Sequence, residues 1–526
     1  MNYADLFRVT LPETALEIAA LLVLVVDLGF LRKAALNMRV AVAALLAVAG
    51  CGAALWAMKF QGNAGLSFGG SGESYLLATG GYTAIAQVGI LVLTALTLLL
   101  LIDSVFTKHV GEYVAVVLMA ATGGLLIAGA QDLLVIFVGL ELLSLGLYII
   151  TAFAKSSAKS AEAAIKYYLF GGMSAAFLLF GFSYFYGLSG STSLWVIQDA
   201  VAQSGSSPLF YLAWILVIAG LGFKVAAVPF HLWAPDTYGG APAPAAAFIA
   251  SVSKVASFAL LLTIASNWLT LQPRLTSGLM GLAVDLHEYD QIWTRIAVVL
   301  LIIAAASMMV GNLAALAQTS IRRLLAYSAI AHAGYILLGV ATLPHYSTAI
   351  ADFPLIAFKI RSVGISSNAV LYYVLTYGLT TIGAFGVVSV VEKATGSDRI
   401  DSFLGLHKRN PLLAAVLLVL FLSLAGIPPL VGFWAKFNLF SAVLGVSAGP
   451  VPFALVALAV AMSAVSLYYY LQVLKRAYVM PAIDESPIKT PPVTMAVLLL
   501  IAAAVVVLGV FPSILQNWIQ SFYPAQ

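Results

Sequence analysis

About fourteen apolar segments, each near twenty residues long, run through this sequence with short links between them, and about twenty helical residues cross a bilayer core of about 30 Å. Hydrophobic residues make up 62% of the chain and charged residues only 9%, against about 25% charged in an ordinary soluble domain. The sequence therefore predicts an all-α polytopic membrane protein with no separate soluble domain.

The predicted spans have boundaries that are uncertain by several residues. They lie at 11–31, 40–58, 82–102, 112–130, 133–153, 162–187, 209–231, 243–268, 294–317, 321–343, 368–391, 411–444, 451–475 and 493–512. The twelfth span is long and interrupted. Two sizeable polar links, 193–206 and 270–293, could each hold a short interfacial helix.

The basic residues are distributed unevenly between the two sides of these spans. Most of the 25 Lys and Arg residues lie in links that follow odd-numbered spans. The positive-inside rule then places those links in the cytoplasm and both termini on the periplasmic or outer side of a bacterial inner membrane. The net charge of +4 is spread over loops rather than gathered in a stripe, so nucleic acid is not an expected partner.

Two local features limit the chemistry and processing of the chain. Cys51 is the single cysteine and lies in an apolar segment, which excludes disulfides, thiolate iron–sulfur sites and zinc clusters within the chain. We expect no metal site and no cofactor here. Asp5, Glu13 and Glu17 surround the first apolar run, and no basic region or small-residue cleavage site is present, so we interpret this run as the first span.

Titratable residues recur near the middle of otherwise apolar spans. Lys224 lies in the seventh predicted span and Lys254 in the eighth. A lysine at the centre of a membrane helix costs roughly 2.5–3.5 kcal/mol on insertion scales. At about 1.5 Å per residue, Glu141, His332 and Lys436 fall at a similar depth. Five such groups on five helices indicate a path for charge.

A weak internal repeat relates two proline-interrupted helices. FKVAAVPFHLW (223–233) has a counterpart in AGIPPLVGFWAKF (425–437), five spans later. An odd repeat length inverts one copy relative to the other, and a broken helix within a membrane must line a polar cavity. We therefore predict two inverted five-helix repeats with broken seventh and twelfth helices. The predicted domain boundaries are 1–111 for an N-terminal three-helix segment, 112–268 and 294–480 for the repeats, and 481–526 for a C-terminal helix.

Glu141 and Lys224 are predicted to act as a pair. An isolated carboxylate in hydrocarbon must find a partner or stay protonated. Burial favours a neutral lysine and a nearby carboxylate favours a charged one, so moving the two groups together or apart would switch the proton on Lys224. The alternative is a fixed ion pair that holds two helices together.

Lys254 and two histidines are candidates for a proton relay. Lys254 has no carboxylate on its own helix, but Ser251, Ser253 and Ser257 could line a hydrated path beside it. The alternative for Lys254 is a partner carbonyl or another subunit. His231 follows Lys224 by two helical turns, and imidazole titrates near neutral pH.

His332 on the tenth span is a similar candidate, and the alternative for each histidine is that it satisfies backbone groups. Two histidines can also ligate haem, but nothing else indicates a haem pocket. Lys436 is predicted to be the terminal site. Three aspartates near predicted span ends are predicted to be solvated caps: Asp103, Asp132 and Asp236. Lys166, at the start of a span, is predicted to be a snorkelling lysine.

Three stretches resemble a known family. They are FKVAAVPFHLWAPDTYGGAPAPAAAFIASVSK (223–254), IRRLLAYSAIAHAGYILLG (321–339) and LSLAGIPPLVGFWAKFNLF (422–440). Together they resemble the antiporter-like membrane subunits of respiratory complex I and of Mrp-type sodium/proton antiporters, over about 110–515 of the chain. The resemblance implies that Glu141 and Lys224 form a coupling ion pair.

The resemblance also implies roles for the other candidates. Lys254 would be the central relay and Lys436 the terminal exchange residue, and His231 and His332 would join a hydrated central axis. NAD, FMN, iron–sulfur clusters and quinone would belong to partner subunits, with the other membrane-arm subunits, the lipid bilayer and protons as this chain's own partners.

Two functions follow as hypotheses. The first is a proton-translocating membrane-arm subunit of a redox-driven NADH:quinone oxidoreductase, with no redox centre in this chain. The second is a subunit of an Mrp-type sodium/proton antiporter, which the buried lysines alone do not exclude. A purely structural scaffold would leave the buried charges unexplained.

Overall fold

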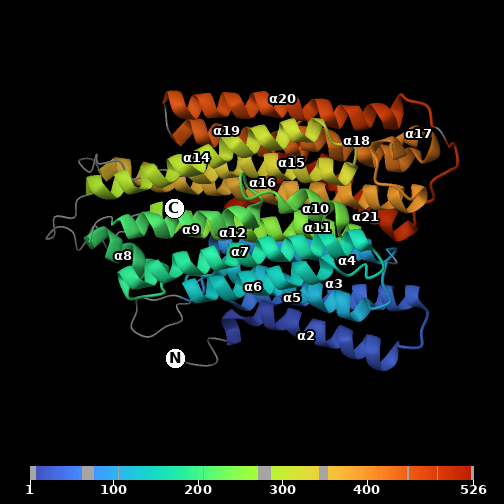
Figure 1. Cartoon of the computed structure of the whole chain (residues 1–526), viewed down its shortest axis with the longest axis horizontal. Helices are drawn as coiled ribbons and strands as arrows, with labels where there is room; N and C mark the ends of the chain where they lie inside the picture. The colour runs from blue at the N-terminus through green and yellow to red at the C-terminus, as the bar shows by residue number, and fades with distance from the viewer. Residues whose placement is uncertain are drawn as a thin grey trace.

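The computed structural model describes residues 7–61, 76–104, 106–204, 207–269, 286–342, 353–446, 449–482 and 484–522. These residues form a bundle of helices that run roughly parallel to one another along the long axis of the molecule (Figure 1). Within these ranges there is no β-strand, only three isolated bridges. The predicted all-α class is confirmed.

The helices of the first half are α2 (Leu11–Val25), the π-helical turn η1 (Val26–Phe30), α3 (Leu36–Gln61), α4 (Gly81–Leu101), α5 (Val110–Gly129), α6 (Leu133–Thr151), α7 (Ala158–Ser189), α8 (Leu194–Ser204), α9 (Pro208–Val225), α10 (Trp233–Gly240), α11 (Ala243–Ala250) and α12 (Val252–Leu269). Those of the second half are α14 (Leu286–Leu316), α15 (Ile321–Ala341), α16 (Phe353–Thr395), the 3-10 turn η2 (Ile400–Phe403), α17 (Leu406–Arg409), α18 (Pro411–Ala425), α19 (Val431–Val446), α20 (Pro450–Tyr478), α21 (Pro492–Val510) and α22 (Pro512–Gln520).

The predicted spans match these helices. In the described part of the chain, 12 helices are long and apolar enough to cross a membrane. The first predicted span is α2 together with η1, and the twelfth is the pair α18 and α19, so each predicted span has its helix. The polar link 193–206 contains α8, as its composition allowed. Most of the link 270–293 lies outside the described residues.

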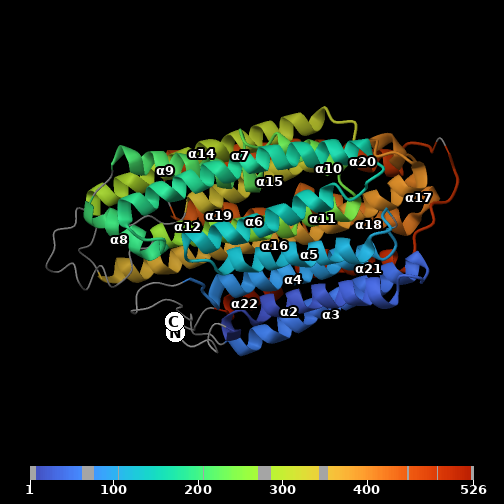
Figure 2. The ribbon, with the colours of Figure 1, turned by 60° about the horizontal axis from the view of Figure 1, so that its bottom comes forward.

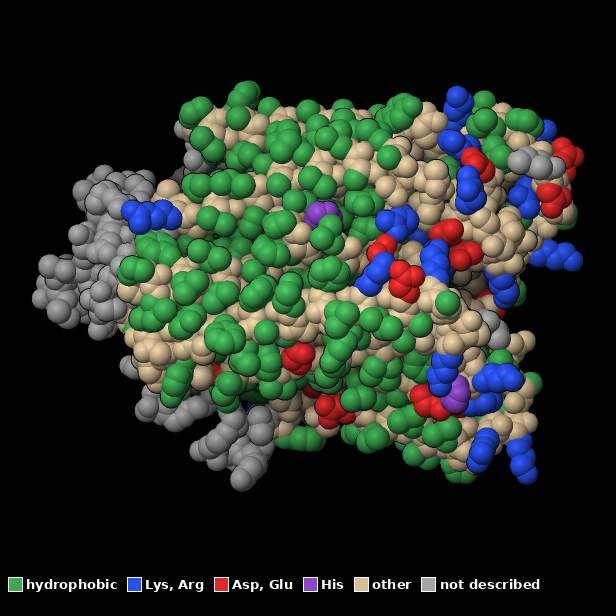
Figure 3. Space-filling view, viewed as in Figure 1, with side chains coloured by type: hydrophobic (Ala, Val, Ile, Leu, Met, Phe, Trp, Pro, Cys, Tyr) green, Lys and Arg blue, Asp and Glu red, His purple; other side chains and the backbone are tan. Residues whose placement is uncertain are grey.

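Charged side chains gather at one end of the bundle. Figure 3 shows Lys, Arg, Asp and Glu concentrated around the end that carries α17, while the rest of the face in view is mostly hydrophobic. Arg322, Arg323, Lys408 and Arg409 all lie in or beside links that follow odd-numbered spans. The separation of charge expected from the sequence is therefore present. The assignment of that end to the cytoplasm stays a prediction.

Two helices are interrupted in the same way, one in each half of the chain. The residue after α9 is Ala226, which has a left-handed backbone with φ 59°, and the residue after α18 is Gly426 with φ 88°. In both, two backbone N–H groups after the helix bond back to its last turn, at 2.8 and 3.0 Å for α9 and at 3.0 and 2.9 Å for α18. The predicted breaks are confirmed, while the domain boundaries stay a prediction.

A third interruption was not foreseen. The predicted eighth span is divided at Ser251 into α11 and α12, and the Ser251 hydroxyl donates to the carbonyl of Ala247 at 2.6 Å. A side-chain bond to a carbonyl one turn back bends helices. The break places Lys254 in the first turn of α12.

The most enclosed helices are those that carry the central candidates. In the most apolar part of each helix, the share of residues that are buried is 100% for α11 with α12, 94% for α15 and 89% for α16, against 22% for α20. The turned view in Figure 2 places α16 among other helices and α2 and α3 at the lower edge. Groups on α12, α15 and α16 are thus shielded from lipid by the chain itself.

Candidate functional site

Lys224 lies in the last turn of α9 and is bonded to a serine of α6. Its ammonium group donates to the hydroxyl of Ser144 at 2.6 Å, and that hydroxyl donates to the carbonyl of Leu140 at 2.5 Å. Both Lys224 and Ser144 are buried. The serine supplies the polar contact that an ammonium group needs away from water.

Glu141, the predicted partner of Lys224, is half-buried on α6 one turn before Ser144. Within the described chain no direct ion pair joins Glu141 to Lys224. The sequence missed Ser144 as the hydrogen-bonding partner. Ser144 could have been found from the sequence, because it follows Glu141 by three residues and so lies on the same face of the helix.

Lys254 is buried between three helices. Its ammonium group donates to the backbone carbonyl of Ala329 on α15 at 2.5 Å and lies 5.7 Å from the ring centroid of Tyr377 on α16. Among the described residues no carboxylate pairs with it. A partner carbonyl was the alternative that the sequence left open. Of the neighbouring serines, Ser257 has a buried hydroxyl with no hydrogen bond recorded in the described structure.

His332 lies one turn after Ala329 on α15, and its two ring nitrogens differ. Nδ1 is 2.9 Å from the hydroxyl of Tyr373, whereas Nε2 is buried and has no partner among the described residues. The imidazole lies within electrostatic range of both Lys254 and Lys436. One nitrogen is therefore oriented by a hydrogen bond, and the other has no partner within the described residues.

A small cavity adjoins His332. It is lined by His332, Tyr373, Thr376, Tyr377, Thr380, Ser423, Leu424, Gly432 and Ala435. The volume available to the centre of a water molecule is about 10 Å³, close to the minimum that holds one water. The lining joins α15 and α16 to both sides of the break between α18 and α19, so one water there would bridge these elements.

Lys436, on α19, forms hydrogen bonds across the break to the end of α18. Its ammonium group donates to the carbonyl of Ala425 at 2.8 Å, to that of Leu424 at 3.2 Å and to the hydroxyl of Ser463 at 2.7 Å. The last carbonyls of a helix lack partners within the helix and carry its negative dipole end. The ring centroid of Tyr335 lies 5.5 Å away. Lys436 is thus held by a broken helix rather than by a carboxylate.

His231 lies apart from these groups. It is half-buried in the segment between α9 and α10, and its Nδ1 atom has no hydrogen-bond partner in the described structure. The hydrogen bond across this break is made by Trp233 rather than His231: the indole N–H of Trp233 donates to the carbonyl of Phe223 at 3.0 Å. The shared helix face expected for His231 and Lys224 does not persist, since α9 ends at Val225.

Hydroxyl and amide groups missed by the sequence reasoning surround the axis of Lys254, His332 and Lys436. Asn312 on α14 donates to the hydroxyl of Tyr335 at 3.0 Å and accepts from that of Tyr469 at 3.2 Å. The hydroxyls of Ser328 and Tyr470 are also hydrogen-bonded. Polar residues in the middle of apolar spans were the signal in the sequence that could have found these groups, because a buried polar group requires a hydrogen-bond partner.

The predicted caps have more specific partners than solvent. Asp132 accepts the backbone N–H of Leu134 at 2.8 Å and caps the N-terminus of α6, as predicted. Asp103 accepts the backbone N–H of Thr494 at 2.9 Å, so it joins the end of α4 to the first turn of α21, a contact that the sequence did not predict. Asp236 is instead an ionic junction at the charged end of the bundle. It binds Lys166 at 2.9 Å and Arg323 at 2.6 Å.

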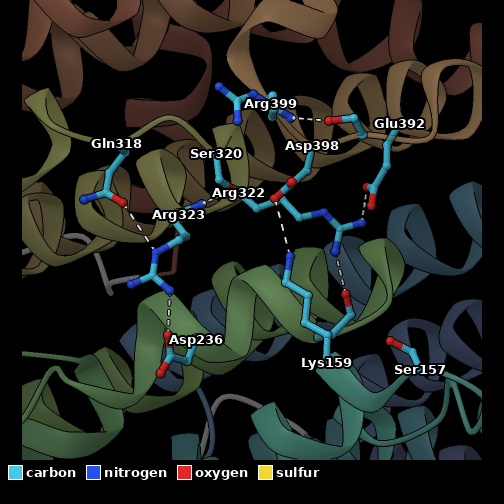
Figure 4. Close-up of polar contacts among 12 residues, drawn as sticks. Ser157, Lys159, Asp236, Gln318, Ser320, Arg322, Arg323, Glu392, Asp398 and Arg399 are labelled. Atoms are coloured by element: carbon cyan, nitrogen blue, oxygen red, sulfur yellow. Dashed lines mark hydrogen bonds and ion pairs between the residues drawn. The ribbon is translucent and has the colours of Figure 1, made fainter.

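Figure 4 shows this junction within a wider network. Arg322 binds Glu392 and the carbonyl of Ala241, and Lys159 lies 3.7 Å from Asp398. Burial raises the pKa of Asp236, but the hydrogen bonds and charges of Lys166 and Arg323 outweigh burial and lower that pKa below its ordinary value. The network ties α7 and α10 of the first half to α15 and α16 of the second.

No metal centre is apparent in the ranges that the structure describes, where no three His, Cys, Asp or Glu side chains gather. The free Cys51 is buried in α3. The candidate site is a set of buried amines, one imidazole and hydroxyls.

Comparison with known proteins places the chain in a family. The family described as "NADH:quinone oxidoreductase/Mrp antiporter, TM" matches residues 130–282, 274–366 and 346–466. The chain belongs to this family. It is 45% identical over 531 residues to "NADH-quinone oxidoreductase subunit N 2" of Acidobacterium capsulatum, covering 99% of this chain and 99% of that protein.

Solved structures agree with this assignment. A chain of respiratory complex I from Thermus thermophilus superposes with a TM-score of 0.73 and 32% identity, covering 96% of this chain and 98% of that one. A chain of the Mrp complex from Dietzia sp. also superposes with a TM-score of 0.73, at 19% identity and covering 97% and 96%. The second likeness shows a shared fold alone. The resemblance first read from three sequence motifs is confirmed.

Proposed function

We propose that this chain is a proton-translocating membrane-arm subunit of an NADH:quinone oxidoreductase, of the type named subunit N among its relatives. The relative at 45% identity carries that name, and the complex I chain is similar over nearly its full length. NADH oxidation and quinone reduction would take place in partner subunits, which would hold the NAD, FMN, iron–sulfur clusters and quinone. The other membrane-arm subunits are the expected direct partners.

The observation that carries the proposal is the buried axis from Lys254 through His332 to Lys436. Lys254 on α12 donates to the carbonyl of Ala329 on α15, and His332 follows one turn later on the same helix as Ala329. A positive charge on Lys254 or on Lys436 disfavours a second positive charge on His332. The protonation of the imidazole is therefore coupled to that of each lysine.

The proposed path of a proton follows from the atoms that have no hydrogen-bond partner in the described structure. A charged Lys254 releases a proton from Nζ, and the unpartnered Nε2 of His332 accepts it as Nδ1 keeps its bond to Tyr373. A water in the adjoining cavity, together with the hydroxyls of Tyr373 and Thr376, carries the proton toward the break at α18 and α19. Lys436, held by two carbonyls and Ser463, is the exchange group at that end.

Glu141, Ser144 and Lys224 form the input to this axis. Glu141 is half-buried on the lateral surface, where a neighbouring subunit can change its charge or its position. Its attraction favours the charged form of Lys224, and Ser144 holds that ammonium group in place. Loss of the attraction favours release of the Lys224 proton toward Lys254. The links that follow odd-numbered spans, and so the charged end, would face the cytoplasm of a bacterial inner membrane.

The test is Lys224→Ala in the complete complex, reconstituted in vesicles. We expect NADH-driven proton uptake to fall to background while electron transfer to an artificial acceptor at the peripheral arm continues, because that reaction does not involve the membrane arm. Leu221→Ala, on the same helix and buried beside it, is a matched control that should retain proton uptake. Undiminished proton uptake in Lys224→Ala would refute the proposal.

An Mrp-type antiporter subunit is the second candidate, because the Mrp complex chain has the same fold. The names of the relatives at 36–45% identity favour the redox complex. Purification of the native assembly separates the two: flavin and iron–sulfur subunits copurify with the first, and only other small membrane proteins with the second.

A further inference from the structure

A buried carboxyl lies outside the Lys–His axis, in the first span. Glu13 on α2 is only 6% exposed, and Gln87 on α4 is 3% exposed. Gln87 Nε2 donates to Glu13 Oε1 at 3.5 Å and to the carbonyl of Leu125 on α5 at 3.3 Å. The pair therefore joins α2, α4 and α5, and the proposed translocation mechanism makes no use of it.

The orientation of the Gln87 amide is determined by its neighbours. A backbone carbonyl can only accept a hydrogen bond, so Nε2 rather than Oε1 must face Leu125. Its second N–H then points to Glu13 Oε1. This leaves two buried acceptors, Glu13 Oε2 and Gln87 Oε1, and within the described residues neither has a hydrogen-bond donor.

No cation on the surrounding helices compensates a carboxylate at this position in the described structure. α4 carries no charged residue, and Glu17, the nearest charge on α2, is acidic. The other charged groups on η1, α3 and α5 are engaged or exposed: Asp27 pairs with Arg39, Glu112 pairs with His109, and Lys59 is exposed. Arg8, which precedes α2, donates to the carbonyl of Phe60. An ionised Glu13 would be a buried, uncompensated charge that also faces an amide oxygen.

We propose that Glu13 binds a proton and is held as a neutral carboxylic acid by Gln87. Addition of one proton to Glu13 Oε2 creates an O–H that donates to Gln87 Oε1, while Gln87 Nε2 continues to donate to Glu13 Oε1. The two side chains then form a ring of two hydrogen bonds, and both unpartnered oxygens are satisfied. Release of that proton restores the carboxylate and breaks the ring.

The ligand of this site is a proton rather than a metal ion. A hard cation is held by several oxygen ligands, and this pair of side chains has only two oxygens without a hydrogen-bond partner in the described structure, Glu13 Oε2 and Gln87 Oε1. The site goes beyond the proposed function and does not rest on it, because it involves only α2, α4 and α5. It gives the N-terminal spans a protonation equilibrium of their own.

Labelling of the intact complex with dicyclohexylcarbodiimide tests the proposal, because this apolar reagent attacks protonated carboxyls in apolar surroundings. Peptide mass spectrometry separates modification at Glu13 from that at Glu17. We expect Glu13 to be modified at neutral pH, with loss of the label at strongly alkaline pH and no change on addition of NaCl at constant pH. Absence of label at acidic and neutral pH, or protection by NaCl, would overturn the proposal.

Two variants give an independent measurement. Glu13→Gln mimics the neutral acid, since its amide can donate to Gln87 Oε1 and accept from Gln87 Nε2. The thermal midpoint of the complex should therefore match that of the wild type at neutral pH, whereas Gln87→Leu should lower it by removing both hydrogen bonds. A lowered midpoint in Glu13→Gln would indicate a functional carboxylate and contradict the proposal. Glu17→Gln is the matched control and should leave labelling of Glu13 unchanged.

Discussion

The Nζ atom of Lys436 lies 2.8 Å from the backbone oxygen of Ala425, the last residue of α18. A lysine placed on the helix that follows a break thus caps the helix that precedes it. The same ammonium group is the proposed exchange group at the end of the axis. Its protonation and the geometry of the break are therefore coupled, because a neutral amine binds two carbonyls less strongly than an ammonium group does.

Replacement of Lys436 by methionine separates charge from side-chain length. We expect NADH-driven proton uptake by vesicles to be lost, because no titratable group remains at the end of the axis. The two carbonyls lose their donor, which costs about 1–3 kcal/mol of stability for a buried unsatisfied group. Ser463→Ala removes one of three partners of Lys436 and should retain most of the uptake. Normal uptake in Lys436→Met would exclude this residue from the path.

Replacement of His332 by phenylalanine retains the ring and removes both nitrogens. Positioned acid–base groups contribute about 10²–10⁴-fold to proton transfer, so we expect the rate of proton uptake to fall by about a hundredfold. Tyr373→Phe removes only the hydrogen bond to Nδ1 and should have a smaller effect. Stopped-flow recording with a pH-sensitive dye in vesicles measures both. Equal rates in wild type and His332→Phe would contradict a relay through the imidazole.

Ser144 is predicted to transmit the effect of Glu141 to Lys224. Ser144→Ala removes the hydroxyl that binds the ammonium group and should reduce coupled proton uptake, though by less than Lys224→Ala does. Ser144→Thr keeps the hydroxyl and should restore uptake. The ratio of protons taken up to NADH oxidised is the measurement. An unaltered ratio in Ser144→Ala would mean that Lys224 is positioned by other groups.

Asp236 is predicted to stabilise the complex at neutral pH but not in strongly acidic buffer. Its pKa is lowered in the folded chain by Lys166 and Arg323, so it contributes stability above its ordinary pKa and loses this contribution as pH falls through the lowered value. Asp236→Asn should therefore lower the thermal midpoint at neutral pH. The difference from wild type should shrink in strongly acidic buffer. A difference that is independent of pH would show that the ionic junction does not stabilise the fold.

The sequence by itself determined the spans and the residues that are costly to bury. Hydropathy is a local property of the chain, so twenty apolar residues predict a crossing whatever surrounds them. The cost of a buried lysine is equally local, which is why Lys224, Lys254 and Lys436 could be singled out. The proline-containing breaks after Val225 and Ala425 were also predictable, because proline lacks the N–H that a helix interior requires.

Only the tertiary structure decided which atoms meet those charges. The partners of Lys254 and Lys224 are Ala329 and Ser144, which lie 75 and 80 residues away in the chain. A backbone carbonyl carries no signature in the sequence, and a serine in an apolar span has many possible partners. The break at Ser251 and the separation of His231 from the axis likewise depend on how helices pack, which periodicity along one helix does not specify.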